Sequence, residues 1–264
     1  MGCFPSKEKS LKEKSYSKAT MSEYSPACCS IPPVVSKGYT PKGRYETIGD
    51  TKMYVTGPSD ASKAIFVVYD IFGFFDQTVQ GADLLAHSGK YQVFMPDFFD
   101  GKPAEMSWMA QGMDGPLGAF FGSTGNPQTA VGKLPGMVDA IGKKYTSIKS
   151  WGILGFCWGG KIVSVVTSNK LCKFAAGAQC HPAMLDPKEA AGIEMPHLMI
   201  ASGDEEVEVV KEFEKGLSVP KHFERFDDQL HGFMTARADL EDEKVKAEYE
   251  RAYKLVIAFF DKHV

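Results

Sequence analysis

The chain has 264 residues, of which 44% are hydrophobic and 24% are charged, as in a soluble globular protein long enough to bury a large core. Its net charge of −3, with 30 scattered Lys and Arg residues, argues against a nucleic-acid partner. No apolar run approaches the roughly 18 residues that a membrane span needs.

The first 40 residues differ in composition from the rest. Residues 1–20 hold five lysines, two glutamates and few apolar side chains, which predicts disorder. Residues 21–40 contain Cys28-Cys29 and Pro32-Pro33 and resemble an extended lead-in. We therefore expect a disordered or extended segment over residues 1–40, followed by a single domain over residues 41–264.

The extreme N-terminus carries a possible lipidation signal. Met1-Gly2-Cys3-Phe4-Pro5-Ser6 fits the pattern for N-myristoylation of Gly2, and Cys3 is then a candidate for palmitoylation. Two acyl chains and the nearby lysines would hold the protein at an anionic membrane surface. The alternatives are that this short motif occurs by chance, or that translation begins at Met21.

The six cysteines suggest where the protein is found. Their spacing fits neither a zinc site nor a regular disulfide ladder, and no hydrophobic signal-peptide core precedes them. We expect a cytoplasmic protein with reduced thiols, anchored to a membrane if its N-terminus is acylated.

Strand and helix patterns alternate from residue 44 onward. A hairpin with a turn at Gly49-Asp50 is predicted over residues 45–55, and residues 100–127 lack clear periodicity and predict a long connection. The other predicted strands cover residues 64–69, 91–96, 150–156, 175–180, 197–202 and 222–226, and the predicted helices cover 76–88, 133–145, 160–168 and 240–263. This alternation predicts an α/β fold with a mostly parallel sheet and helices on both faces.

The sharpest chemical signal is the motif Gly155-Phe156-Cys157-Trp158-Gly159-Gly160, between a predicted strand and a predicted helix. It has the form of the G-x-S-x-G nucleophile elbow with Cys in place of Ser. Gly155 and Gly159 would relieve crowding in so tight a turn, and the start of the helix favours the Cys157 thiolate. The alternative is a buried structural cysteine in a glycine-rich turn.

The remaining catalytic groups are predicted from chain order, which in this arrangement is nucleophile, acid and then His. Asp204 is the first carboxylate after the strand over 197–202, although Glu205 and Glu206 compete for its role. His231 follows the last predicted strand. His181 also follows a strand, but it precedes the acid and fits a pocket-lining or structural role better.

These residues suffice for hydrolysis without a metal or an organic cofactor. His231 would take the thiol proton and later protonate the leaving oxygen, while Asp204 fixes its tautomer. Two backbone N–H groups should bind the oxyanion, one from Trp158 and one from the loop after the strand over 64–69.

The chain resembles the dienelactone hydrolase (carboxymethylenebutenolidase) family of α/β-hydrolases over roughly residues 44–262. The resemblance rests on the elbow above, Tyr69-Asp70-Ile71-Phe72-Gly73, Pro96-Asp97-Phe98-Phe99 and His231-Gly232-Phe233. It implies the triad Cys157, Asp204 and His231, and an oxyanion hole formed by the N–H groups of Ile71 and Trp158. Asp70 stands where bacterial members carry a thiol-tuning Glu, and its side chain is one methylene shorter.

The resemblance also directs attention to the substrate pocket. Bacterial members bind a substrate carboxylate with arginines, for which Lys102 and Arg237 are possible substitutes or else solvated surface charges. Phe72, Phe99 and Trp108 would make the pocket more apolar, and core packing is the alternative for each.

The expected function is hydrolysis of an ester or lactone, resembling dienelactone, through a cysteine acyl-enzyme. A broad-specificity carboxylesterase or thioesterase on the same fold is an alternative. A non-catalytic redox-sensing or scaffold protein is a third, which the complete triad pattern argues against. The expected partner is a small-molecule ester or lactone.

Overall fold

The computed structural model describes residues 31–88 and 90–264, in which eight strands form one sheet. The strand order is β1-β2-β4-β3-β5-β6-β7-β8, and pairing is antiparallel from β1 to β4 and parallel from β4 to β8. The strands are β1 (Arg44–Ile48), β2 (Thr51–Thr56), β3 (Lys63–Val68), β4 (Tyr91–Pro96), β5 (Ser150–Phe156), β6 (Ala176–Cys180), β7 (His197–Ser202) and β8 (Lys221–Phe226). The predicted α/β class with a mostly parallel sheet is confirmed.

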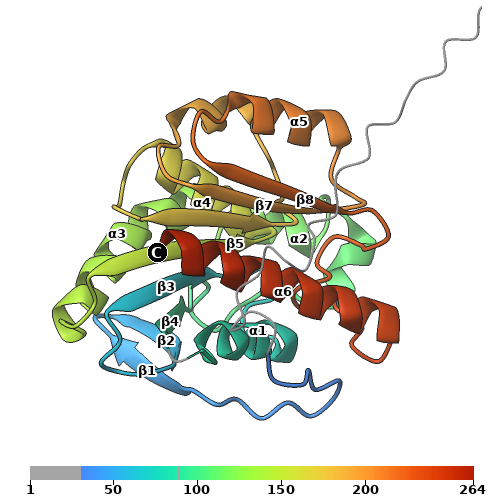
Figure 1. Cartoon of the computed structure of the whole chain (residues 1–264). Coiled ribbons are helices and arrows are strands. Elements are labelled where there is room, and N and C mark those ends of the chain that lie inside the picture. Colours follow the sequence, from blue (N-terminus) through green and yellow to red (C-terminus); the bar gives the residue numbers. More distant parts are fainter. Residues whose placement is uncertain (1–30, 89) are drawn as a thin grey trace, which may run out of the picture.

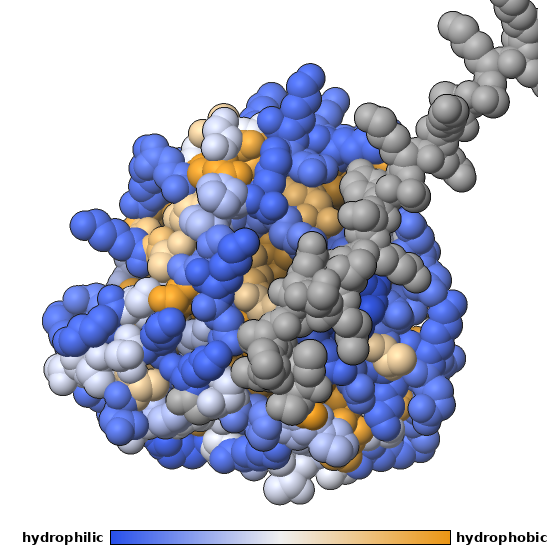
Figure 2. All heavy atoms as spheres, in the orientation of Figure 1, coloured by the Kyte–Doolittle hydropathy of each residue, from blue (hydrophilic) through white to orange (hydrophobic). Residues whose placement is uncertain are grey.

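Helices cover both faces of the sheet (Figure 1). One layer contains α1 (Asp76–Ala86) and α6 (Glu243–His263), and the other contains α3 (Pro127–Lys144), α4 (Trp158–Ser168) and α5 (Val207–Gly216). The central strands β3, β4, β6 and β7 are buried on both faces, because their side chains alternate between the two layers. Within β7, for example, Met199 and Ala201 pack with Phe213 of α5, whereas Leu198 and Ile200 join the main core. The face of the molecule in Figure 2 is largely hydrophilic, with smaller apolar areas between the hydrophilic residues.

Several elements differ from their predicted positions. α3 begins at Pro127 rather than at residue 133, because the Asn126 side chain accepts a hydrogen bond from the Gln128 N–H and proline suits a first helical turn. The predicted connection over residues 100–127 contains the 3₁₀-helix η3 (Met106–Gln111) and the short helix α2 (Pro116–Phe121). A second 3₁₀-helix, η4 (Pro187–Gly192), and α5 were also not predicted.

The predicted N-terminal segment is described only from residue 31 onward. Residues 31–40 contain no helix or strand, and the Val35 N–H and Tyr39 hydroxyl bind Gln80 and Asp83 of α1. Gly2 and Cys3 lie outside the described residues, so their lipidation stays a prediction. In residues 31–88 and 90–264, no helix is both long and apolar enough to cross a membrane.

The start of α4 packs directly against the backbone of β3, which leaves no space for a side chain at Gly159. A Cβ atom added there would lie 2.1 Å from the Val68 carbonyl oxygen. We expect Gly159→Ala to destabilise the fold by about 1–3 kcal/mol, as in overpacked cores. Thermal unfolding should therefore shift down by roughly 5 °C.

The control for this variant is Gly142→Ala, in an exposed part of α3 where an added Cβ meets no atom within 4 Å. It should leave stability unchanged or raise it slightly, because alanine favours helix. Equal melting temperatures for the two variants would contradict the close packing at Gly159.

Candidate active site

Cys157 lies at the corner between β5 and α4, at the carboxyl edge of the parallel sheet. Its backbone has φ +52° and ψ −115°, an uncommon and costly conformation for a residue with a side chain. Gly155 and Gly159 make the turn possible, since a Cβ on Gly155 would lie 2.1 Å from the Gly159 carbonyl oxygen. The motif therefore has the geometry of a nucleophile elbow, with a half-buried thiol at its apex.

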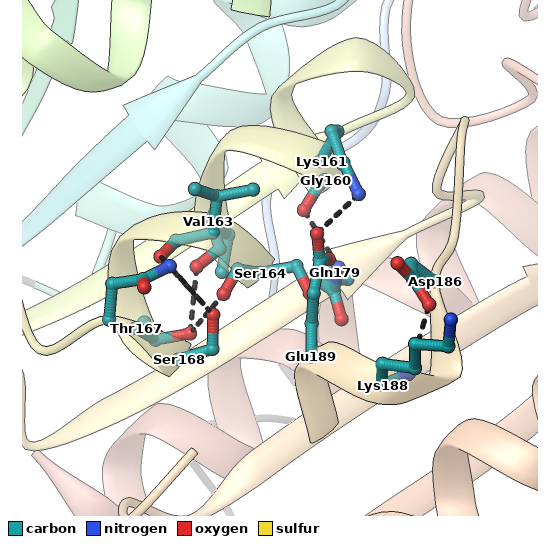
Figure 3. A network of polar contacts seen from close by, with 12 residues as sticks. Gly160, Lys161, Val163, Ser164, Thr167, Ser168, Gln179, Asp186, Lys188 and Glu189 are labelled. Carbon is teal, nitrogen blue, oxygen red and sulfur yellow. Dashed lines mark hydrogen bonds and ion pairs between the residues drawn. The ribbon is translucent and has the colours of Figure 1, made fainter. Parts of the chain in front are cut away.

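Polar contacts behind the elbow hold α4 in place. The Gln179 side chain of β6 donates to the Gly160 carbonyl at 2.7 Å, and its oxygen lies 2.8 Å from Nε2 of the buried His197. Lys161 forms an ion pair with Glu189 of η4, next to this contact (Figure 3). These groups hold the first turn of α4, which begins directly after Cys157.

His231 lies in the loop after β8, and its ring Nδ1 is 2.7 Å from a carboxylate oxygen of Glu205. The other oxygen of Glu205 accepts the Ser202 N–H, and this carboxylate is buried. Asp204, by contrast, is exposed and accepts the backbone N–H of His231 at 2.7 Å. The prediction that Asp204 binds the imidazole is thus wrong in the structure, which gives that contact to Glu205.

The reason lies in the turn that follows β7. Gly203 donates its N–H to the Gln229 carbonyl, so the turn runs alongside the loop that carries His231. Asp204 then faces the backbone of that loop, and the longer Glu205 side chain extends inward to the ring. Glu206, the third acid of the run, is exposed and precedes α5.

The His231 ring also interacts with the Cys157 side chain. Burial lowers the pKa of His231, but the hydrogen bonds and charges of Cys157 and Glu205 outweigh burial and raise that pKa to about 10. A His side chain held between a thiol and a carboxylate is the arrangement that activates a cysteine nucleophile.

The two predicted oxyanion donors lie at neighbouring strand ends, because β3 and β5 pair in parallel with Val68 opposite Gly155. Trp158 is the first residue of α4, where a backbone N–H has no partner within the helix. Ile71 lies in the loop after β3, and its carbonyl accepts the Ala104 N–H. The role of both N–H groups stays a prediction.

Asp70 connects two loops of the site. It is buried, and its oxygens accept the N–H groups of Phe72 at 2.8 Å and Ala236 at 3.3 Å, together with a hydrogen bond from the Thr235 side chain. Burial raises the pKa of Asp70. Among the described residues these hydrogen bonds do not include the Cys157 thiol. Asp70 instead connects the loop that follows His231 to the loop after β3, which contains Ile71.

His181 lies beside the base rather than in its place. Its ring is fully buried, 5.2 Å from the His231 ring between centroids, and neither nitrogen has a hydrogen-bond partner in the described part of the chain. Burial holds the pKa of His181 well below its usual value, so this ring is neutral. The geometry agrees with a pocket-lining or structural role.

The predicted substrate-binding residues do not converge. Lys102 and Trp108 line a cavity of ≈ 630 Å³ formed by residues 101–124, whose lining includes neither Cys157 nor His231. Arg237 is exposed, with its stem against Gly232.

The predicted aromatic pocket residues belong largely to the core. Phe72 and Phe99 are buried, and Phe99 packs against Trp158 in a tilted orientation with 4.9 Å between ring centroids. Core packing therefore accounts for Phe99.

A second cavity, of ≈ 340 Å³, opens directly against His231. It lies between the loop after β6 and the start of α5. Apart from His231, its lining consists of Pro182, Ala183, Met184, Leu185, Asp204, Glu205, Glu206, Val209 and Val210. Within residues 31–88 and 90–264, no group of three or more His, Cys, Asp or Glu side chains is arranged to hold a metal ion.

Known proteins are similar to this chain in sequence. The model of the dienelactone hydrolase family matches residues 51–264. An uncharacterized AIM2 family protein of Schizosaccharomyces pombe is 34% identical over 85% of this chain and 93% of its own length. The human carboxymethylenebutenolidase homolog is 27% identical over 84% and 91%, respectively.

Solved structures share the fold at lower identity. A dienelactone hydrolase from Anabaena variabilis is 14% identical with a TM-score of 0.61, covering 85% of this chain and 98% of that one. An esterase from Pyrococcus furiosus is 15% identical with the same TM-score, covering 89% and 99%.

Proposed function

Since the chain belongs to the dienelactone hydrolase family, we propose that this hydrolase cleaves esters or lactones through an acyl-enzyme formed on Cys157. The observation that carries the proposal is the position of the His231 ring, whose Nδ1 lies 2.7 Å from the Glu205 carboxylate and which interacts with the Cys157 side chain. This arrangement supports the assignment of Cys157 as nucleophile, His231 as base and Glu205 as orienting acid.

In the first half of the reaction, the Cys157 thiolate attacks the carbonyl carbon and forms a C–S bond while the carbonyl electrons move to oxygen. The N–H groups of Ile71 and Trp158 are the donors proposed for that oxyanion. When the tetrahedral intermediate collapses, the C–O bond breaks, and the His231 imidazolium gives its proton to the leaving oxygen.

In the second half, water attacks the thioester and His231 accepts the water proton. Collapse then breaks the C–S bond and releases the acid and the Cys157 thiolate, which restores the ion pair. Throughout the cycle, Glu205 keeps the Nδ1 proton directed toward itself, so that Nε2 faces the reacting atoms.

Trapping the acyl group tests this mechanism directly. The protein should release nitrophenol from p-nitrophenyl acetate, and rapid acid quenching should leave an acetyl group on the peptide that contains Cys157, as read by mass spectrometry. Hydrolysis that continues after iodoacetamide has blocked Cys157 would refute the assignment of Cys157 as the nucleophile.

Parallel assays on dienelactone and on p-nitrophenyl esters separate a narrow lactonase from a broad carboxylesterase.

The broad carboxylesterase has one observation in its favour. Lys102 lines the other cavity and Arg237 is exposed, so the described cavity at His231 contains no Lys or Arg to bind a substrate carboxylate. Comparable rates of hydrolysis of dienelactone and of neutral esters would favour a broad carboxylesterase.

A further inference from the structure

The cavity at His231 is coupled to the nucleophile through the loop after β6. The Ala183 N–H donates to the Cys157 carbonyl at 3.0 Å, so one wall of the cavity is bonded to the elbow itself. Cys157 is not among the lining residues, but the cavity borders the His231 ring, which must reach the leaving oxygen, and this adjacency connects the cavity with the alcohol part of an ester.

The two walls of this cavity differ in chemistry. One is apolar and consists of Pro182, Ala183, Met184, Leu185, Val209 and Val210, and the other consists of Asp204, Glu205 and Glu206. Among the described lining residues there is no Lys or Arg, and Glu206 forms no ion pair in the part of the chain that the structure describes. The nearby Arg225 is bound to Asp227 and to the Glu205 carbonyl.

The charges do not cancel within the cavity. His231 is the one cationic group among the described lining residues and is paired with Glu205, so Asp204 and Glu206 add negative charge that no lining group neutralises. A carboxylate placed several ångströms from these acids would be repelled, which should lower the rate roughly tenfold.

We propose that this cavity is the alcohol-side subsite of the enzyme, and that it accepts neutral apolar or cationic groups and disfavours carboxylates. This inference rests on the proposed function and gives that function a substrate class. The family resemblance implies the opposite preference, in which cationic side chains bind a substrate carboxylate.

The experiment compares three acetates that differ in the charge of the alcohol part: phenyl acetate, 3-carboxyphenyl acetate and 3-(trimethylammonio)phenyl acetate. Each kcat/KM is divided by the hydroxide-catalysed rate of the same ester, which removes differences in leaving-group reactivity. We expect the carboxylate ester to be the poorest substrate. Glu206→Lys should raise its kcat/KM relative to phenyl acetate about tenfold.

Glu208→Lys is the matched control. Glu208 is exposed on the first turn of α5, pairs with Lys211 at 2.8 Å and does not line the cavity, so the same charge change should alter this ratio less than about threefold. If the carboxylate ester is preferred, and Arg237→Gln removes the preference, anion recognition belongs to Arg237 and the inference is overturned.

A second readout does not depend on turnover. Anionic and cationic methanethiosulfonates modify Cys157 at rates that follow the local potential, and mass spectrometry isolates this site from the other thiols. Glu206→Lys should raise the anionic-to-cationic rate ratio about tenfold relative to Glu208→Lys. An unchanged ratio would overturn the charge inference, whereas failure to hydrolyse any ester would contradict only the proposed function.

Discussion

Cys157→Ala should lower kcat for ester hydrolysis by a factor on the order of 10⁴ or more, because it removes the atom that forms the acyl-enzyme. Cys157→Ser should retain only part of this activity. The serine hydroxyl can still attack the carbonyl, but His231 must first remove its proton, which is held more tightly than that of a thiol. The measurement is the steady-state rate on p-nitrophenyl acetate, with the folded state checked by thermal unfolding.

Cys172→Ala provides the control, because Cys172 is another half-buried free cysteine and lies after α4 rather than at the elbow. Burial raises the pKa of Cys172 to about 11, so it is a thiol at neutral pH and should react slowly with alkylating agents. Its variant should keep the wild-type rate. If Cys157→Ala hydrolyses esters as fast as Cys172→Ala, the nucleophile is a different residue.

The sheet and the elbow could be predicted from the sequence because each depends on local information. Continuous apolar runs such as residues 64–69 mark strands covered on both faces, and glycines on either side of Cys157 mark the tight turn. Each coincides with a strand or turn near the predicted position. His231 could be selected as the base because the order of nucleophile, acid and His along the chain is set by the topology of the fold.

The acid could not be selected in this way, because Asp204, Glu205 and Glu206 are adjacent and chemically alike. The choice depends on how the turn after β7 meets the loop before α6, through the hydrogen bond from Gly203 to Gln229. Contacts between segments distant in sequence have no local signal.

The cavities were unpredictable for a related reason. Lys102 and Arg237 were selected by their positions in the chain, but η3 and α2 enclose Lys102 in a separate cavity, and the Arg237 stem packs on Gly232. The pocket at His231 is instead lined by α5 and by the loop after β6, neither of which was included in the predicted substrate site.

The assignment of Glu205 leads to the second large effect. In Glu205→Gln, the amide oxygen can still accept the Ser202 N–H, but the amide nitrogen would then face Nδ1 of His231. This favours the tautomer with the proton on Nε2, which cannot accept a proton from the thiol. We expect kcat to fall on the order of 10²- to 10³-fold.

Asp204→Asn is the matched comparison. An Asn oxygen can still accept the His231 backbone N–H, so the loop should keep its position and kcat should fall less than about tenfold. The reverse order, with Asp204→Asn inactive and Glu205→Gln active, would return the triad acid to Asp204.

The pH dependence of the same variants separates charge from geometry. The wild-type pKa of His231 is raised above its ordinary value to about 10, so the stability that its ion pairs contribute is fully present below about pH 6.5 and is lost as the pH rises through about 10. The imidazolium is also the general acid, and kcat/KM should therefore decline over the upper part of this range.

Glu205→Gln removes one of the charges that raise the pKa of His231, so the alkaline decline of the variant should begin at lower pH. In this variant, Cys157 should also react more slowly with iodoacetamide near neutrality. An alkaline limb at the same pH in both proteins would show that Glu205 does not set the ionisation of His231, even if the variant is slow.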